Sequence, residues 1–214
     1  MIATEPDARA FCADRTDPAG MARLDRFAAL LAAENERQNL VSGASLQTVW
    51  QRHFADSLQL LDHVSRGTED LSDTGPWLDL GSGAGIPGLV LACAQPQTTI
   101  LLVESRKRRI DWLARAAGEL GLANCRVMGA RLETVETVPA RVITARAFAP
   151  LGKLLQLSAR FSTRDTTWLL PKGRSAAQEL AEQPTAVRMM FHVEQSHTDA
   201  EGGILIGQGT PQFR

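Results

Sequence analysis

Apolar residues recur at helical spacing in the first third of the chain and then give way to short apolar runs. Asp17-Pro18 is typical of a helix start, with an acidic N-cap followed by proline. The predicted helix reaches about residue 37, and its apolar positions are Met21, Leu24, Phe27, Leu30 and Leu31. A second helix is predicted from Leu46 to Val64. Residues 1–16 show no clear period and are expected to be irregular, and the polar, turn-rich residues 65–75 are expected to be a linker.

From Trp77 onward, strand-like apolar runs alternate with helical patterns. The runs are Trp77–Leu80, Thr98–Val103, Arg126–Met128, Arg141–Thr144, Thr167–Leu170, Arg188–Val193 and Ile204–Ile206. Helices are predicted between several of them, at Gly88–Ala94, Arg108–Leu120 and Leu151–Phe161. This alternation predicts an α/β fold, with a mostly parallel seven-stranded sheet and helices on both faces. The last two runs have no long helix between them, so an antiparallel hairpin is expected at the sheet edge.

The domain organisation follows from this change of pattern. We expect residues 1–75 to form a small helical N-terminal extension and residues 76–214 to form the main domain. The two parts are expected to pack as one compact unit, with the extension near the mouth of the site described next.

A glycine-rich turn lies between the first predicted strand and the helix after it. Gly81, Gly83 and Gly85 follow that strand directly, and glycine permits positive φ and close approach of the backbone to a ligand. The next helix presents free N–H groups at the same place. Asp79, just before the turn, could order the loop or receive a cationic ligand group. Such an acid repels a pyrophosphate but suits an ammonium group, as in the methionyl part of S-adenosylmethionine.

Glu104 ends the second predicted strand. An acid roughly 20 residues past a glycine turn, at the end of the second strand, can accept both hydroxyls of a ribose. The alternative is a solvated side chain at a strand end. The spacing favours the ribose contact.

Composition and charge exclude several classes of protein. The formal net charge of −1 lacks the basic excess of a dedicated nucleic-acid binder, although basic residues outnumber acidic ones within 76–214. Cys12, Cys93 and Cys125 form no CxxC pair and no zinc spacing, so we expect reduced thiols and no metal. No apolar run approaches the ~20 residues that span a bilayer, and the charged N-terminus is unlike a signal peptide. A cytoplasmic protein is therefore expected.

Several segments between about residues 35 and 174 carry a family resemblance. They are Asn35–Ser42, Arg52–Leu58, Asp79–Gly88, Val103–Ser105 with Arg108 and Arg109, Ala145–Phe148 and Lys172–Gly173. The chain resembles the class I methyltransferases, and more closely the bacterial 16S rRNA guanine methyltransferase G family, also called glucose-inhibited division protein B. This resemblance implies a Rossmann-like fold, S-adenosylmethionine as cofactor, and methyl transfer to ring nitrogen 7 of a guanine in 16S ribosomal RNA.

The resemblance also implies a cofactor site by position. Its residues are Asp79, Gly81, Gly83, Gly85, Ile86, Glu104, Leu132, Glu133 and Arg146. Within this set Glu104 is implied to hold the ribose, and Leu132 and Glu133 are implied to contact the adenine ring. Arg146 is implied to lie next to the cofactor at the end of the fourth strand. Ala145 stands where the family often has serine, which leaves a hydroxyl role there in doubt.

The chemistry fits the lack of an obvious catalytic dyad. Guanine nitrogen 7 has an in-plane lone pair and no proton, so it needs no general base, and catalysis can come from orientation and preorganised electrostatics. The segment after the fourth strand lacks the Asn/Asp-Pro-Pro-aromatic loop used on exocyclic amines and the cysteine used on pyrimidine carbons. Arg146 and Phe148 are candidates to position the base, although Phe148 could equally belong to the core. Three polar residues are predicted on one helix face: His53, Asp56 and Ser57. This face could lie over the cofactor cleft, or the three residues could form a structural hydrogen-bond cluster.

RNA contact is expected from a basic set, and the partner is expected to be small-subunit rRNA or a precursor of the small subunit, bound by a monomer. The set is Arg106, Lys107, Arg108, Arg109, Lys153, Lys172 and Arg174. A charge run can also be a solvated helix face, and Arg108 and Arg109 could cap local carboxylates. Three other functions compete with this one. The glycine spacing and Asp79 disfavour a Rossmann oxidoreductase, and the net charge disfavours a non-catalytic RNA-binding module. A small-molecule methyltransferase would share every cofactor residue.

Overall fold

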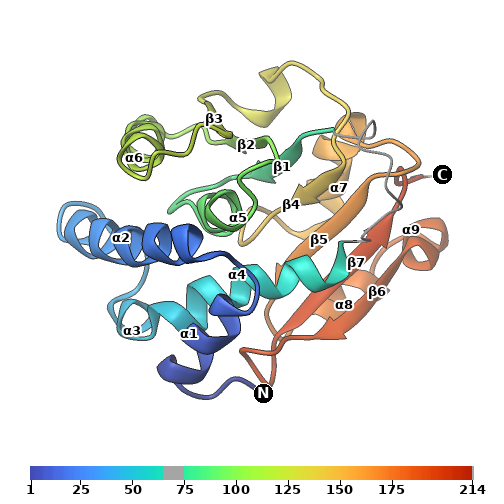
Figure 1. The fold of residues 1–214 in the computed structure, drawn as a ribbon. Helices are drawn as coiled ribbons and strands as arrows, with labels where there is room; N and C mark the ends of the chain where they lie inside the picture. The colour runs from blue at the N-terminus through green and yellow to red at the C-terminus, as the bar shows by residue number, and fades with distance from the viewer. Residues whose placement is uncertain (65–74, 214) are drawn as a thin grey trace.

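One seven-stranded sheet forms the centre of the computed structural model, which describes residues 1–64 and 75–213. The strand order is β3-β2-β1-β4-β5-β7-β6. The strands are β1 (Trp77–Leu80), β2 (Ile100–Val103), β3 (Cys125–Met128), β4 (Val142–Thr144), β5 (Thr167–Lys172), β6 (Phe191–Gln195) and β7 (Gly203–Gln208). Neighbours from β3 to β5 pair in parallel, whereas β7 pairs antiparallel with β5 and β6 (Figure 1). The predicted sheet and its closing hairpin are confirmed.

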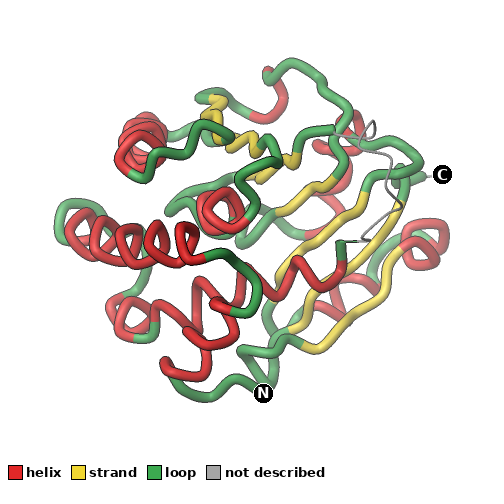
Figure 2. Tube along the Cα trace, in the orientation of Figure 1, coloured by secondary structure: helices red, strands yellow, loops and turns green. Residues whose placement is uncertain are grey.

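Helices cover both faces of this sheet (Figure 2). One face carries α5 (Gly88–Ala94) and α6 (Lys107–Glu119), and the other carries α7 (Leu151–Ser158), α8 (Ala176–Ala181) and α9 (Thr185–Met190). Successive strand residues point to opposite faces, so Leu102 joins one hydrophobic cluster while Leu101 and Val103 join the other. The result is a helix–sheet–helix sandwich whose central strands are buried on both faces, while the edge strands β3 and β6 are largely exposed or half-buried. Short 3-10 turns are η3 (Leu132–Thr134) and η4 (Ala159–Phe161).

The N-terminal residues form more structure than predicted. The expectation that residues 1–16 are irregular is wrong, because α1 spans Glu5–Ala13. Thr4 caps this helix, and Ala8 and Cys12 are buried. Helix α2 spans Pro18–Asn35 with Asp17 as its N-cap, as predicted. Only two residues of α1 are buried, so its sequence shows too short an apolar pattern to reveal a period.

The second predicted helix is broken into four short pieces. They are α3 (Gly43–Gln47), the π-helix η1 (Trp50–Ala55), α4 (Asp56–Leu58) and the 3-10 turn η2 (Gln59–His63). Phe27 of α2 stacks on Phe54, with ring centroids 5.6 Å apart, and lies 6.4 Å from Trp112 of α6. The N-terminal helices therefore share one hydrophobic cluster with the main domain. Most of the predicted linker, residues 65–74, lies outside the described residues.

The region before the hairpin also differs from the prediction. Residues 188–190 end α9 instead of starting a strand, and β6 begins at Phe191. Pro184 precedes α9, and Val187 is its buried residue. Helix α8 was not predicted, because Ala176 is its only buried residue and leaves almost no apolar period.

Candidate active site

The glycine turn lies at the carboxyl end of β1, where ligands bind in open α/β sheets. Gly81, Gly83 and Gly85 have positive φ values of 68°, 53° and 90°. A Cβ on Gly81 would lie 2.5 Å from the Phe148 ring, and one on Gly85 would lie 2.4 Å from Leu89. On Gly83 it would meet nothing closer than 3.5 Å. Two of these glycines are therefore fixed by packing, and Gly83 faces open space.

Asp79 supports the turn from beneath. The residue is 1% exposed, and its carboxylate accepts hydrogen bonds from Thr144 Oγ1 (3.0 Å) and from the Gly88 N–H (3.2 Å). Burial raises the pKa of Asp79 to about 6, although hydrogen bonds from Ser82, Thr144 and Gly88 oppose the shift. Of the two roles expected for this acid, the geometry favours ordering the loop.

Glu104 ties the loops after β1 and β2 together. One carboxylate oxygen accepts from the Gly83 N–H at 3.1 Å, and the other accepts from the N–H groups of Ser105 (2.7 Å) and Arg106 (2.8 Å). The residue is 8% exposed, at the wall of a cavity. A carboxylate has about four acceptor sites, so Glu104 keeps about one, on the oxygen that the Gly83 N–H contacts, for a hydrogen bond from a ligand.

A cavity of about 340 Å³ opens above the turn, within the size range of small-molecule sites. Six residues predicted for the cofactor line it: Gly81, Gly83, Ile86, Glu104, Leu132 and Arg146. Asp79, Gly85 and Glu133 lie outside the lining, and Glu133 is exposed on η3 next to Leu132.

The N-terminal extension completes this cavity. Leu40 and Val41 belong to its lining. The Asn35 side-chain oxygen accepts from the N–H groups of Leu40 (2.8 Å) and Val41 (3.0 Å), which holds this segment in place. Arg109 donates to the Asn39 carbonyl at 2.7 Å and joins the segment to α6. The sequence marked this segment only by its family resemblance and predicted no role for it, although an asparagine at a helix end is a common loop-ordering signal.

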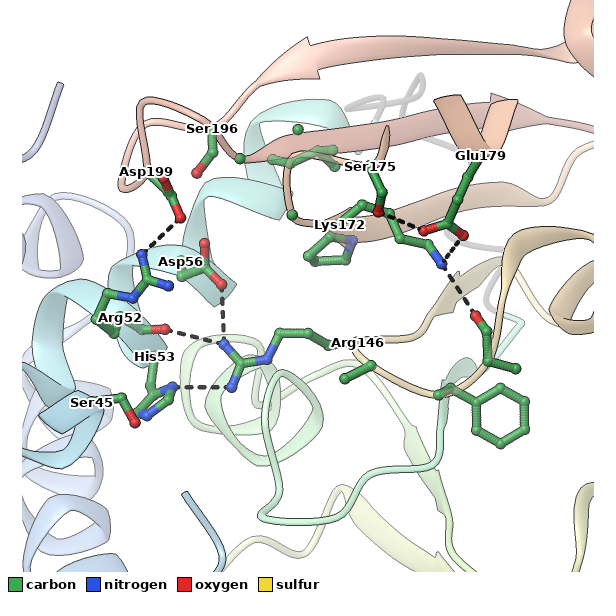
Figure 3. Close-up of a pocket in the computed structure, with 18 of the residues that line it drawn as sticks. Ser45, Arg52, His53, Asp56, Arg146, Lys172, Ser175, Glu179, Ser196 and Asp199 are labelled. Atoms are coloured by element: carbon green, nitrogen blue, oxygen red, sulfur yellow. Dashed lines mark hydrogen bonds and ion pairs between the residues drawn. The ribbon is translucent and has the colours of Figure 1, made fainter. Parts of the chain in front are cut away.

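Arg146, after β4, lines both this cavity and a second one, whose lining residues are drawn in Figure 3. Its guanidinium donates to the Arg52 carbonyl and to Asp56, each at 3.1 Å, and contacts His53 Nδ1 at 3.0 Å. Arg52 and His53 lie in the π-helix η1. Such helices are rare in proteins, and those that occur are often found at functional sites. Ala147, the next residue, has a φ of 54°, an uncommon conformation for a side chain with a Cβ. The loop is therefore held in a single, specific shape.

His53 is a neutral acceptor for Arg146. Burial, with the nearby Arg146 and Arg52 charges, lowers the pKa of His53 to about 3. Since a guanidinium only donates, Nδ1 must accept and the ring proton lies on Nε2. Nε2 is buried without a hydrogen-bond partner among the described residues. Ser57, predicted on the same face, donates instead to the His53 carbonyl within the helix.

The second cavity, of about 850 Å³, shares Arg146, Ala147 and Phe148 with the first. Lys172, at the end of β5, lies inside it with its side chain 10% exposed, and it pairs with Glu179 of α8 at 2.8 Å. Burial acts to raise the pKa of Glu179, but hydrogen bonds from Lys172, Ser175 and Leu151 hold that pKa below its ordinary value. Glu179 is therefore ionised at neutral pH. Glu179 was not predicted from the sequence, because no local motif marks it.

The remaining basic residues of the predicted RNA set lie on the surface. Arg106, Lys107 and Arg108 are exposed at the start of α6, and Lys153 is exposed on α7. Arg108 donates to the Arg37 carbonyl at 3.0 Å. Its partner is therefore a backbone carbonyl and not one of the local carboxylates that the sequence suggested as an alternative to RNA. Lys107 pairs with Asp111, and Arg174 pairs with Glu201; both ion pairs are solvent-exposed. Phe148 is half-buried and lines both cavities.

Two further properties concern the described part of the chain. None of its helices is long and apolar enough to cross a membrane. Across residues 1–64 and 75–213, no three His, Cys, Asp or Glu side chains converge as they would around a metal ion.

The family model and the sequence relatives described here agree on one family. The family model for rRNA small subunit methyltransferase G (GidB) matches residues 21–203. Ribosomal RNA small subunit methyltransferase G of Erythrobacter litoralis is 61% identical over 209 residues, covering 98% of each chain. The protein of the same name from Novosphingobium aromaticivorans is 53% identical over 209 residues, which is 97% of this chain and 89% of the relative. A SAM-dependent methyltransferase of Aquifex aeolicus has the same fold, with a TM-score of 0.55 at 12% identity over 80% of this chain and 97% of that one. The chain therefore belongs to the rRNA small subunit methyltransferase G family.

Proposed function

We propose that this protein transfers the methyl group of S-adenosylmethionine to ring nitrogen 7 of a guanine in small-subunit ribosomal RNA. The observation that carries the proposal is the pair of cavities that meet at Arg146–Phe148. One is built like a nucleoside site, with a glycine turn and a fixed carboxylate, and the other is larger and contains the Lys172–Glu179 ion pair. Family membership supports the choice of rRNA over a small molecule. We place the reaction in the cytoplasm, where small subunits are assembled.

The residues of the smaller cavity fit S-adenosylmethionine. Gly83 leaves room for a ligand against its backbone, because an added Cβ would have only the Gly81 carbonyl and the Arg109 side chain near it. Glu104 offers its remaining acceptor site to a ribose hydroxyl, and Ile86 and Leu132 offer apolar walls to an adenine ring. When bound, the sulfonium supplies an electrophilic methyl group, and its carbon–sulfur bond electrons stay on sulfur as the new carbon–nitrogen bond forms.

The protein's own part in this reaction is orientation. Guanine nitrogen 7 attacks with a lone pair, so no proton has to leave before transfer. His53 is unsuited to act as a base, because its Nδ1 is occupied by Arg146 and its pKa is low. The Arg146–Phe148 loop, fixed by three acceptors, sets the boundary at which donor and acceptor meet. Alignment of two bound reactants is worth up to about 7–11 kcal/mol in favourable cases.

Glu104→Gln is expected to weaken S-adenosylhomocysteine binding, and Glu104→Ala is expected to weaken it more. Loss of one charge-assisted hydrogen bond costs about 1.5–3 kcal/mol. Titration calorimetry measures the effect, and melting temperatures show whether the loops after β1 and β2 stay folded. Glu136→Gln, on an exposed carboxylate outside the cavity, serves as the control. Unchanged affinity in both Glu104 variants would move the ribose site elsewhere.

The exposed cations at the start of α6 are expected to bind RNA phosphates. Arg106→Ala and Lys107→Ala should each weaken rRNA binding and reduce its salt slope by about one unit for each phosphate that is no longer bound. Arg164→Ala is the matched control, because Arg164 is 91% exposed and precedes β5 at the opposite end from Lys172. Filter binding across a salt series decides the matter. Equal slopes for all three variants would remove α6 from the RNA surface.

The reaction itself is tested with methyl-labelled S-adenosylmethionine and small subunits from cells that lack this protein. We expect label in 16S rRNA, recovered as 7-methylguanosine after digestion to nucleosides. Label on an exocyclic amine or a ribose oxygen would refute the chemistry. Transfer to small molecules of a cell extract, with none to RNA, would favour the small-molecule methyltransferase.

A further inference from the structure

The second cavity has an unused donor and an unused acceptor side by side. Lys172 Nζ has three N–H groups, and two of them are used within the described chain, by the Ala149 carbonyl (3.2 Å) and by Glu179 (2.8 Å). The Glu179 carboxylate has about four acceptor sites, of which the Leu151 N–H, the Ser175 hydroxyl and Lys172 take three. One N–H and one lone pair therefore remain on neighbouring groups (Figure 3).

This arrangement matches one edge of guanine. The Watson–Crick edge of guanine places the O6 acceptor directly beside the N1–H donor, and adenine reverses that order. Enzymes that modify a base often read this edge after they take the base out of its stack. The pair is well shielded from water, with side chains 10% and 21% exposed, so an unmatched base would leave the remaining N–H and the remaining lone pair without partners.

The position of Lys172 also sets the orientation of the base. Its ammonium contacts the carbonyl of Ala149, next to Phe148 in the loop that borders the cofactor cavity. In guanine, nitrogen 7 lies beside O6 on the side away from N1. A base with O6 at Lys172 and N1–H at Glu179 would thus turn nitrogen 7 toward that loop.

We infer that the cavity of about 850 Å³ receives the target guanine, with Lys172 donating to O6 and Glu179 accepting from N1–H. This inference rests on the proposed function and adds to it the residues that select guanine. It also gives Lys172 a base contact in place of the phosphate contact expected from sequence. The 2-amino group has no assigned partner.

The test combines base analogues with one conservative substitution. The acceptor is 16S rRNA assembled into small subunits. It carries guanine, inosine or 2-aminopurine at the position that the wild-type protein methylates. Inosine keeps O6 and N1–H, so the wild-type protein should methylate it within about threefold of guanine. 2-Aminopurine lacks both groups, and kcat/KM should fall at least about 100-fold.

Glu179→Gln separates base reading from a structural role. A carboxamide can donate to the bare N1 of 2-aminopurine, so the preference for guanine over 2-aminopurine should fall about tenfold or more. A merely structural Glu179 would lower transfer to both substrates equally and leave their ratio unchanged, which would overturn the inference. S-adenosylhomocysteine affinity should stay at the wild-type value, because Glu179 does not line the cofactor cavity.

Two wild-type outcomes keep the inference and the function distinct. If Glu179→Gln does not fold, equal use of guanine and 2-aminopurine, or rejection of inosine, would still refute the base contacts. In that case the methyl transfer itself would stand. A wild-type protein that methylates no 16S rRNA at all would overturn the proposed function, and this inference with it.

Discussion

Gly83→Val is expected to abolish S-adenosylhomocysteine binding while the protein remains folded. The residue lines the cofactor cavity and has a φ of 53°, and a β-branched side chain there would fill the space that the ligand needs. An added Cβ meets no atom closer than 3.5 Å, so packing is spared. The left-handed conformation alone costs about 1–2 kcal/mol. Calorimetry measures binding, and circular dichroism with thermal melting measures the fold.

Gly121→Val controls for that backbone strain. Gly121 follows α6, has a φ of 65° and has no atom within 4 Å of an added Cβ. It does not line the cofactor cavity. We expect a similar loss of stability and unchanged binding. Wild-type affinity in Gly83→Val would mean that the pocket has been assigned to the wrong loop.

Arg146→Lys is expected to lower methyl transfer about 100-fold with cofactor affinity much less affected. An ammonium is a point charge and cannot satisfy the Arg52 carbonyl, Asp56 and His53 in the planar geometry of a guanidinium. The loop that separates the two cavities would then shift, and a misplacement of about 1 Å between reactants costs about 100-fold in rate. Single-turnover transfer to small subunits at saturating cofactor measures the effect.

Arg15→Lys provides the comparison. Arg15, like Arg146, pairs with a carboxylate, in this case that of Asp62, and its side chain is 23% exposed against 24% for Arg146. It lines neither cavity. Its replacement should leave transfer unchanged. An Arg146→Lys variant that transfers methyl at the rate of Arg15→Lys would show that the fixed loop does not align the reactants.

Local patterns account for what could be predicted from sequence. The central strands are buried on both faces and appear in the sequence as apolar runs, and the turn appears as a glycine motif. The sheet and the Gly81–Gly85 loop could therefore be predicted from sequence. The position of Glu104 could be predicted because its distance from the turn is set by one strand–helix–strand unit. The prediction for residues 188–190 was wrong because a short apolar run suits a helix end and a strand equally.

Contacts between distant segments account for the rest. Glu179 pairs with Lys172 from a helix with only one buried residue, and Asp56 meets Arg146 across 90 positions. Arg146 also donates to the Arg52 carbonyl inside the π-helix, a contact that no local pattern in the sequence reveals. The sequence predicts Asp79 next to the turn, but it does not predict the orientation of the side chain. A residue before a turn can point toward the ligand or beneath the loop. Burial and Thr144 decide that direction.

The most direct test of the proposed reaction is a map of 7-methylguanosine in small-subunit rRNA. Cells with and without this protein are compared after a chemical step that cleaves RNA at 7-methylguanosine, and reverse transcription locates the cleavage. We predict a cleavage at one guanine that disappears when the protein is absent. It should return with the wild-type protein and fail to return with Gly83→Val. An identical cleavage pattern in cells with and without the protein would contradict the assignment of this chain as a guanine-N7 methyltransferase.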